Sequence, residues 1–225
     1  MVTRALGVEH YGLYNFLAVL FRNIISFFDL GTYAFYVKLS QRPTDNRIVS
    51  FVLFYDTILF IISFIFLVLV FVFGNTENIF TTNSFTIIVA SFFLAWLMIF
   101  HAKLINFMDA IGATITSEVI TSCIRLTIVL TVCFLYYFDK LDLSLLLHTQ
   151  NFIYIGFFFV FYFFAKQYYK PQKYSGTITE VVYEFKQYCQ PIIFSEAIVI
   201  LAVIADRWLL QIFGGLSAQG YFSLG

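Results

Sequence analysis

Charged residues are absent from three long stretches of this sequence, and this absence limits the possible folds more than any other feature. Between Glu77 and Lys103 there are 25 residues without Asp, Glu, Lys or Arg. There are 23 such residues between Asp142 and Lys166, and 20 between Asp56 and Glu77. An apolar run of about 18 or more residues is long enough to cross the hydrocarbon core of a bilayer as a helix. The pattern therefore predicts a polytopic integral membrane protein.

The predicted spans are helices rather than the strands of a barrel. In lipid every backbone N–H and C=O needs a partner within the chain, so only helices or closed barrels cross a membrane. Barrel strands alternate polar and apolar residues, whereas Ile58–Phe73 is apolar on all sides. Because 61% of residues are hydrophobic and 12% are charged, the predicted fold class is all-α, a polytopic membrane helical bundle. The net charge of zero argues against a nucleic-acid partner.

Six spans and the beginning of a seventh are predicted. Turn-forming residues separate several of them, at Arg42–Asn46, Gly74–Thr76 and Lys170–Pro171. The seventh span is expected to begin near Ser217. The first six are expected at Tyr11–Val37, Ile48–Phe73, Ser84–Ile105, Glu118–Phe138, Leu145–Ala165 and Gln187–Phe213.

Basic residues between the spans predict the orientation. One side carries only Arg4 and Lys140. Cytoplasmic loops of membrane proteins are enriched in Lys and Arg, so the other, more basic side is predicted to be cytoplasmic. The first span then runs from outside to inside, with Met1 outside. The cytoplasmic side carries Lys38, Arg42, Arg47, Lys103, Lys166, Lys170, Lys173 and Lys186.

The segment Lys166–Lys186 is the longest polar stretch of the chain. Its apolar residues recur at three- and four-residue spacing, which indicates an amphipathic helix in the cytoplasmic interface that leads into the next span. We interpret this segment as a linker between two helical bundles; a binding site for an acidic partner is the alternative. The apolar face is Ile178, Val181, Val182, Phe185 and Tyr188.

Ionisable residues inside the predicted spans are the main candidates for function, because each costs about 2.5–3.5 kcal/mol near the bilayer centre. Arg22 and Asp29 lie seven residues apart, on one helical face. Arg22 lies deep enough to need a cavity or a partner. Arg125 has the same spacing from Glu118 in the fourth span. A cavity with arginines suits a pyrophosphate, because guanidinium presents a bidentate fork to phosphate oxygens.

The sixth span carries three further ionisable residues, each with two readings. Glu196 follows Pro191 by five residues, and is either functional or accommodated where the proline loosens the helix. Asp206 and Arg207 are adjacent near the outer end, where they act either as interfacial groups or in function. By contrast, Asp56 and Glu118 lie near cytoplasmic ends and are expected to be solvated.

Several catalytic and metal-binding motifs are missing. There is no G-x-x-x-x-G-K-[ST] segment, which argues against an ATP-driven pump within this chain. His10, His101 and His148 are isolated, and Cys123, Cys133 and Cys189 lack metal-ligand spacing, so no metal or cofactor is predicted. The acidic pair of Asp139 and Asp142 falls on the outer side, where metal-dependent sugar-lipid chemistry is not expected. We therefore interpret the chain as a transporter and not an enzyme.

Two stretches resemble a known family. The first is Leu6–Gly12, followed by Asp29–Gly31 and the basic Lys38. The second comprises Tyr188–Pro191, Ala205–Leu210, Phe213–Gly215 and Gln219–Tyr221. Together they resemble the Wzx-type polysaccharide flippases of the multidrug/oligosaccharidyl-lipid/polysaccharide (MOP) exporter superfamily. In that family the first pattern marks the second transmembrane helix, and the second marks the seventh helix and the turn to the eighth.

The resemblance implies a particular domain organisation. Family members have two helical bundles in parallel repeat, and this chain looks like helices two to seven. Residues 1–165 would be an N-terminal bundle lacking its first helix, 166–186 the linker, and 187–225 the start of a C-terminal bundle. A lost first helix agrees with the outside position of Met1.

The resemblance also implies a function at the cytoplasmic (inner) membrane. It implies a flippase that moves undecaprenyl-pyrophosphate-linked oligosaccharide to the outer leaflet for O-antigen or other surface polysaccharide, by rocking of two bundles. The expected partners are the lipid-linked oligosaccharide, membrane lipid, and a polysaccharide polymerase and chain-length regulator. Arg22, Arg125 and Arg207 are the candidates for substrate binding in the lumen. Asp29, Glu196 and Asp206 are the candidates for ion coupling.

Two other classes of function remain as alternatives. A membrane-embedded glycosyltransferase or polymerase of the same pathway would need clustered carboxylates or a large outer loop. A multidrug exporter of the same superfamily would be expected to have a smaller and more acidic cavity. The arginines at positions 22 and 125 therefore favour the flippase.

Overall fold

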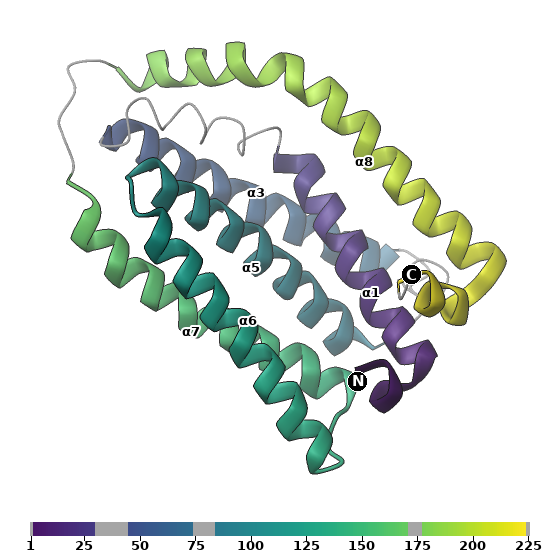
Figure 1. The fold of residues 1–225 in the computed structure, drawn as a ribbon. Coiled ribbons are helices and arrows are strands. Elements are labelled where there is room, and N and C mark those ends of the chain that lie inside the picture. Colours follow the sequence, from purple (N-terminus) through teal and green to yellow (C-terminus); the bar gives the residue numbers. More distant parts are fainter. Residues whose placement is uncertain (1, 30–44, 74–83, 171–176, 224–225) are drawn as a thin grey trace.

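The computed structural model describes residues 2–29, 45–73, 84–170 and 177–223. Its regular elements in these ranges are all α-helices, as the sequence predicts (Figure 1). The helices are α1 (Val2–Asp29), α3 (Asn46–Phe73), α5 (Phe85–Ala110), α6 (Thr114–Tyr137), α7 (Leu143–Tyr168) and α8 (Ile178–Phe222).

Five of these segments are long and apolar enough to cross a membrane, which fits a multi-pass membrane protein. α1 is not among them, and the end of the predicted span Tyr11–Val37 lies outside the described residues. The predicted third span ends at Ile105, but α5 continues to Ala110. The five segments are Arg47–Phe73, Phe85–Ala110, Thr114–Tyr137, Leu143–Tyr168 and Ala197–Phe222.

The main core lies where α1 packs against α5 and α7. One face of α1 repeats apolar side chains at three- and four-residue spacing, and this face is buried. The ring of Phe21 meets that of Phe92 on α5 edge to face, with centroids 5.8 Å apart. The buried residues of this core on α1 are Leu13, Phe16, Leu17, Leu20, Phe21 and Ile25.

Short connections join α5, α6 and α7 into a continuous meander. Gly112 takes a positive φ of 80° between α5 and α6, which a residue with a Cβ adopts poorly. Asp142 caps α7, because its carboxylate accepts a hydrogen bond from the Ser144 amide at 3.2 Å. The aspartate that sequence reasoning weighed as half of a metal pair therefore has a structural role.

The second half of the predicted linker, from Ile178 to Lys186, and the predicted sixth span form one helix, α8. The first residues of the linker, Lys166–Tyr168, belong to α7, and residues 171–176 lie outside the described residues. Near its start, Val181, Phe185 and Cys189 pack against Ile48 and Val52 of α3. Ile178 and Val182 of the predicted apolar face are exposed instead. The side chain of Tyr188 lies outside the described residues.

The far end of α8 bends back on the bundle. Gly215 has non-helical angles, with φ 67° and ψ −169°, and it divides α8 into a long arm and a short final segment. Figure 1 shows the long arm running beside the bundle and the final segment, in yellow, turning in against α1. The start of a seventh span near Ser217 stays a prediction, because Ala197–Phe222 together make up one candidate span.

Candidate functional site

Two of the predicted arginines come together where α1 approaches α8. Arg22 lies on an exposed position of α1, and its charge acts on the guanidinium of Arg207. Neither guanidinium forms a salt bridge with a carboxylate in the described ranges of the chain. Two like charges in a medium of low dielectric repel each other strongly. This pair is therefore well suited to an anion that would bind both groups.

The Arg207 side chain is held by the bent end of α8. Its Nη1 donates to Oε1 of Gln219 at 3.2 Å and to Oγ of Ser223 at 3.3 Å. The amide of Gln219 in turn donates to the backbone carbonyl of Arg207 at 2.6 Å, and the guanidinium lies 4.7 Å from the centre of the Phe222 ring. These contacts orient Arg207 without neutralising its charge.

Unpartnered polar atoms lie beside both arginines in the sequence. Nδ2 of Asn23 and Oε1 of Gln211 are buried without a hydrogen-bond partner within the described structure. Asn23 adjoins Arg22 on α1, and Gln211 lies one helical turn after Arg207 on α8. Buried polar atoms are normally satisfied by protein or water. Successive side chains on a helix point about 100° apart, so it is Gln211, on the same face of α8 as Arg207, that supports a polar ligand region beside this arginine.

The closest approach of α1 and α8 is made by two glycines. A Cβ on Gly12 would overlap the carbonyl oxygen of Leu216, and a Cβ on Gly220 would overlap that of Val8. The two contacts are reciprocal, because each carbonyl belongs to the residue just after a glycine of positive φ, namely Gly7 or Gly215. This crossing closes α1 against the bent end of α8.

Sequence reasoning missed this crossing, although the sequence contains a signal for it. Gly7 and Gly12 are five residues apart, and so are Gly215 and Gly220. Each second glycine is followed by two large residues and a small polar one, in Leu13–Asn15 and Tyr221–Ser223. Comparing the two segments with each other would have indicated an internal repeat.

Arg125 belongs to a different part of the molecule from the first pair. It is exposed on α6, and its charge acts on His101 of α5 and Tyr154 of α7. The His101 ring packs edge to face with Tyr154 and Phe161, at centroid distances of 5.6 and 5.2 Å. Nε2 of His101 is buried with no hydrogen-bond partner in the described ranges. The structure therefore divides the three predicted arginines between two environments.

Of the three acidic candidates, the structure describes the side chain of only one, Asp206. Asp206 is exposed on α8 and, within the part of the chain described, forms no ion pair. Asp29 ends α1 and Glu196 lies within α8, but their side chains fall outside the described residues. Ion coupling through these residues stays a prediction. Glu118 is exposed, as expected.

The expectation that Asp56 is solvated is wrong. Its side chain is buried on α3, where Oδ1 lies 2.5 Å from Nζ of Lys103 on α5. Lys103 is equally buried within α5, although it was counted with the basic residues of the cytoplasmic side. Proximity to a helix end suggested solvent for both groups. Pairing instead allows both charges to stay within the bundle.

Comparison of this chain with protein-family models, with curated proteins and with solved structures found no match.

Proposed function

We propose that this chain acts in a flippase of the Wzx type, which moves undecaprenyl-pyrophosphate-linked oligosaccharide across the cytoplasmic membrane. The observation that carries the proposal is the pair of Arg22 on α1 and Arg207 on α8, which lie close enough for the charge of one to act on the other and form no salt bridge to a carboxylate in the described structure. A pyrophosphate carries several negative oxygens, and guanidinium groups bind such oxygens through paired hydrogen bonds. Two arginines from different helices would hold it from two sides.

The same pair argues against the alternative of a cation exporter. A cationic drug approaching Arg22 and Arg207 would meet like charge, which costs free energy in a water-poor site. Asp206 adjoins Arg207 in sequence, but successive side chains on a helix point about 100° apart. The arginine pair therefore favours an anionic cargo over a cationic one.

The glycine crossing supplies an element that a carrier of this kind needs. In the proposed cycle, α1 and the bent end of α8 separate at Gly12 and Gly220 to open the outer side, and close there to open the inner side. Because Gly12 and Gly220 have no side chains, the backbones of the two helices lie close together in the closed contact. Gly215 gives the end of α8 a bend at which its angle to the long arm can change.

The remaining parts of the proposal follow from the family resemblance. The more basic end of the helices would face the cytoplasm, and surface polysaccharide or O-antigen would be the final product. Asp29 and Glu196 are proposed to couple transport to an ion gradient. A polysaccharide polymerase and a chain-length regulator would act on the translocated product.

Binding of undecaprenyl pyrophosphate tests the proposal directly. The purified chain in nanodiscs would be titrated with this lipid, and the bound lipid measured by native mass spectrometry. A hydrogen bond to a charged group contributes about 1.5–3 kcal/mol, so Arg22→Ala should weaken binding about tenfold or more. Undecaprenyl monophosphate should bind less tightly than the pyrophosphate, because it offers fewer oxygens to the two arginines.

Arg125→Ala is the matched control, since it removes an exposed arginine from the other environment. This variant should bind undecaprenyl pyrophosphate like the unchanged chain. Equal loss in Arg22→Ala and Arg125→Ala, or no loss in Arg22→Ala, would overturn the role of the pair. In cells that lack their own flippase, Arg22→Ala in the transporter should also abolish surface polysaccharide while membrane insertion is retained.

A further inference from the structure

The helix α3 stands away from α5 along much of its length. Their backbones make little close contact, and the space between them is bridged by side chains. Phe60 of α3 packs on Trp96 of α5 with ring centroids 4.7 Å apart, and Asp56 reaches Lys103. One turn of helix beyond this ion pair, Phe107 and Ala110 of α5 pack against the cluster that contains Ile48 and Val52 of α3. Beside this contact, the two helices line a cavity together with α7.

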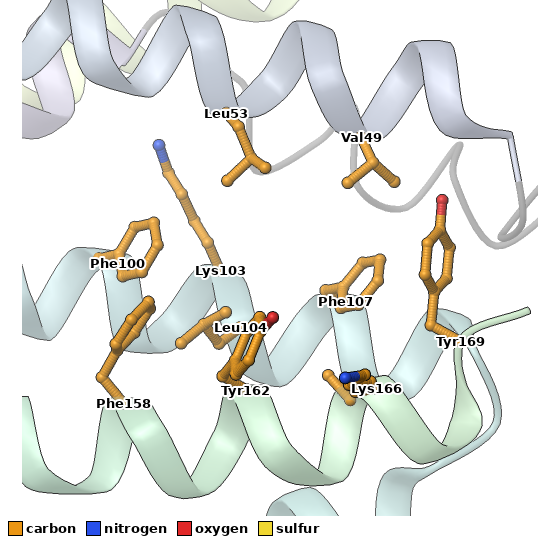
Figure 2. A pocket seen from close by; sticks show the side chains of 11 residues that line it. Val49, Leu53, Phe100, Lys103, Leu104, Phe107, Phe158, Tyr162, Lys166 and Tyr169 are labelled. Carbon is orange, nitrogen blue, oxygen red and sulfur yellow. The ribbon is translucent and has the colours of Figure 1, made fainter. Parts of the chain in front are cut away.

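This cavity has a volume of about 470 Å³, within the range of about 300–1,000 Å³ that is usual for small-molecule sites. Its walls are mainly apolar and come from α3, α5 and α7, so a bound molecule would be contacted from three helices. Figure 2 shows Phe100, Phe107 and Phe158 along its floor, with Val49 and Leu53 of α3 opposite them. Such walls suit a hydrocarbon chain.

The polar groups of the cavity gather at the end where α7 finishes. Lys166 is exposed there and has no carboxylate partner in the described part of the chain. Lys103 at the other end is neutralised by Asp56. Tyr169 points toward α3 at the same end as Lys166 (Figure 2). The cavity therefore combines apolar walls with one uncompensated cation at its mouth.

Tyr169 strengthens the polar end of the cavity. Burial, with the nearby charge of Asp45, raises the pKa of its hydroxyl, so the group stays protonated and able to donate a hydrogen bond. The Asp45 carboxylate does not cancel the charge of Lys166, because Asp45 is already paired with Arg47 at 2.8 Å. An ammonium group and a neutral hydroxyl donor both suit a phosphate.

We propose that this cavity is a binding site for an anionic glycerophospholipid, with one acyl chain between α3, α5 and α7 and the phosphate at Lys166 and Tyr169. The site is distinct from the arginine pair, which lies between α1 and α8. The proposal rests on insertion of these helices in a membrane and not on flippase activity. In the predicted orientation, the lipid belongs to the cytoplasmic leaflet.

A phospholipid fits the cavity better than either a free anion or a partner helix. A free phosphate would leave the apolar walls unused, since the one cation of the cavity without a carboxylate partner in the described residues, Lys166, lies at the mouth. A partner helix would have to enter a space bounded by three helices of this chain. An anionic lipid uses both the apolar walls and the cation, and its leaflet lies next to the mouth.

Quenching by brominated lipids tests this site in the full chain. A tryptophan would be placed in the cavity by Phe107→Trp, with Trp96→Phe and Trp208→Phe removing the native signals. The protein would be reconstituted in phosphatidylcholine vesicles with increasing brominated phosphatidylglycerol. One lysine near an anionic lipid surface contributes about 1 kcal/mol. Half-maximal quenching should therefore need about fivefold less brominated phosphatidylglycerol than brominated phosphatidylcholine.

Lys166→Ala should abolish this fivefold preference. Lys170→Ala is the matched control, because it removes an equally exposed lysine that lies four residues further along and does not line the cavity. Loss of preference in both variants would mean general attraction to the surface and would overturn the site. Retention of preference in Lys166→Ala would also overturn it.

Two further variants separate the bound lipid from other sources of quenching. Leu53→Phe would narrow the cavity without adding a second tryptophan, and it should reduce quenching of a second reporter at Phe158→Trp by either lipid. A reporter on the outer surface of α7, Phe159→Trp, should show no preference between the two lipids, because this position is exposed and lies outside the cavity. If the Phe107→Trp and Phe159→Trp reporters show the same lipid preference in quenching, the quenching comes from bulk lipid and the proposed site is overturned. Protection from both lipids at Phe107 would indicate an occupying peptide and overturn the proposal.

Discussion

The helices α5 and α8 have similar apolar character but very different surroundings. In the most apolar stretch of α5, 33% of residues are buried inside the molecule, whereas in that of α8 only 6% are buried. α5 packs against α1, α6 and α7, while α8 touches α3 near its start and α1 near its bent end. Composition alone thus sets whether a helix suits a membrane. It does not set which helix becomes the centre of the bundle.

The difference in burial between α5 and α8 indicates separate roles for the helical core and for the long arm of α8. The α1, α5 and α7 core holds its helices through buried side chains, so it is expected to behave as one rigid body. The long arm of α8 packs on α3 near its start and, through Ile204, on the main core, while large apolar side chains on the rest of its described surface are exposed. This exposed surface is suited to lipid or to further helices. The most exposed examples on this arm are Ile198, Val199, Leu201, Ile212 and Phe213.

The largest effect is expected from breaking the buried ion pair between Asp56 of α3 and Lys103 of α5. Asp56→Ala would leave the Lys103 ammonium buried without its partner, which costs about 3–5 kcal/mol in the free energy of unfolding. Asp206→Ala on α8 removes an exposed carboxylate and should change the stability by less than about 0.5 kcal/mol. Thermal unfolding of the purified variants in mild detergent would measure both.

The double variant Asp56→Leu/Lys103→Met provides a check on the cause. It removes both charges and keeps apolar volume, so most of the lost stability should return. If the double variant is as unstable as Asp56→Ala, the cost would come from packing rather than from an unpaired charge.

The next largest effect is expected from shortening a buried apolar side chain, and it can be compared with the same change at an exposed position. Leu94 of α5 is fully buried, at 0% exposure, whereas Ile212 of α8 is 69% exposed. Leu94→Ala should cost about 2–5 kcal/mol, because it removes packed methyl groups and leaves a cavity. Ile212→Ala should cost less than about 0.5 kcal/mol. Similar losses in SDS-induced unfolding would mean that α8 is packed in the membrane by a partner.

A smaller effect is expected at the glycine crossing, where the bent end of α8 packs on α1. Gly12→Ala forces a methyl group against the Leu216 carbonyl, and overpacking of this kind costs about 1–3 kcal/mol. Gly156→Ala is the control, because a Cβ there meets no atom within 4 Å. A disulfide between Glu9→Cys and Ser217→Cys, whose native side-chain oxygens lie 3.4 Å apart across the crossing, should form more slowly with Gly12→Ala. Equal rates would show that the crossing tolerates a side chain.

Much of the fold could be predicted from the sequence, because the spacing of charges reflects the thickness of the bilayer. The helices at Asn46–Phe73 and Leu143–Tyr168 lie within a few residues of their predicted positions. The ends were less predictable, since α5 continues beyond Lys103 once that charge is paired. Lys103 was counted with the cytoplasmic side because its partner on α3, Asp56, is distant in the sequence.

The candidate site was predictable in its residues but not in its grouping. Intramembrane charge indicated Arg22, Arg125 and Arg207 individually. Only the packing of α1 on α8 shows that Arg22 and Arg207 lie together and that Arg125 lies elsewhere. Contacts between residues distant in the chain depend on helix packing, which hydropathy does not specify.

The smallest effect concerns the polar contact that joins α1 to α7 within the core. The Tyr14 hydroxyl donates to Oε1 of Gln150 on α7 at 2.8 Å. Tyr14→Phe removes this bond and should cost about 0.5–1.5 kcal/mol. Tyr183→Phe on α8 removes a hydroxyl from a side chain that is 68% exposed, so its effect should be smaller. If thermal unfolding shows equal shifts for the two variants, α1 would be held by apolar packing alone, and the contrast between the two regions would not extend to their polar contacts.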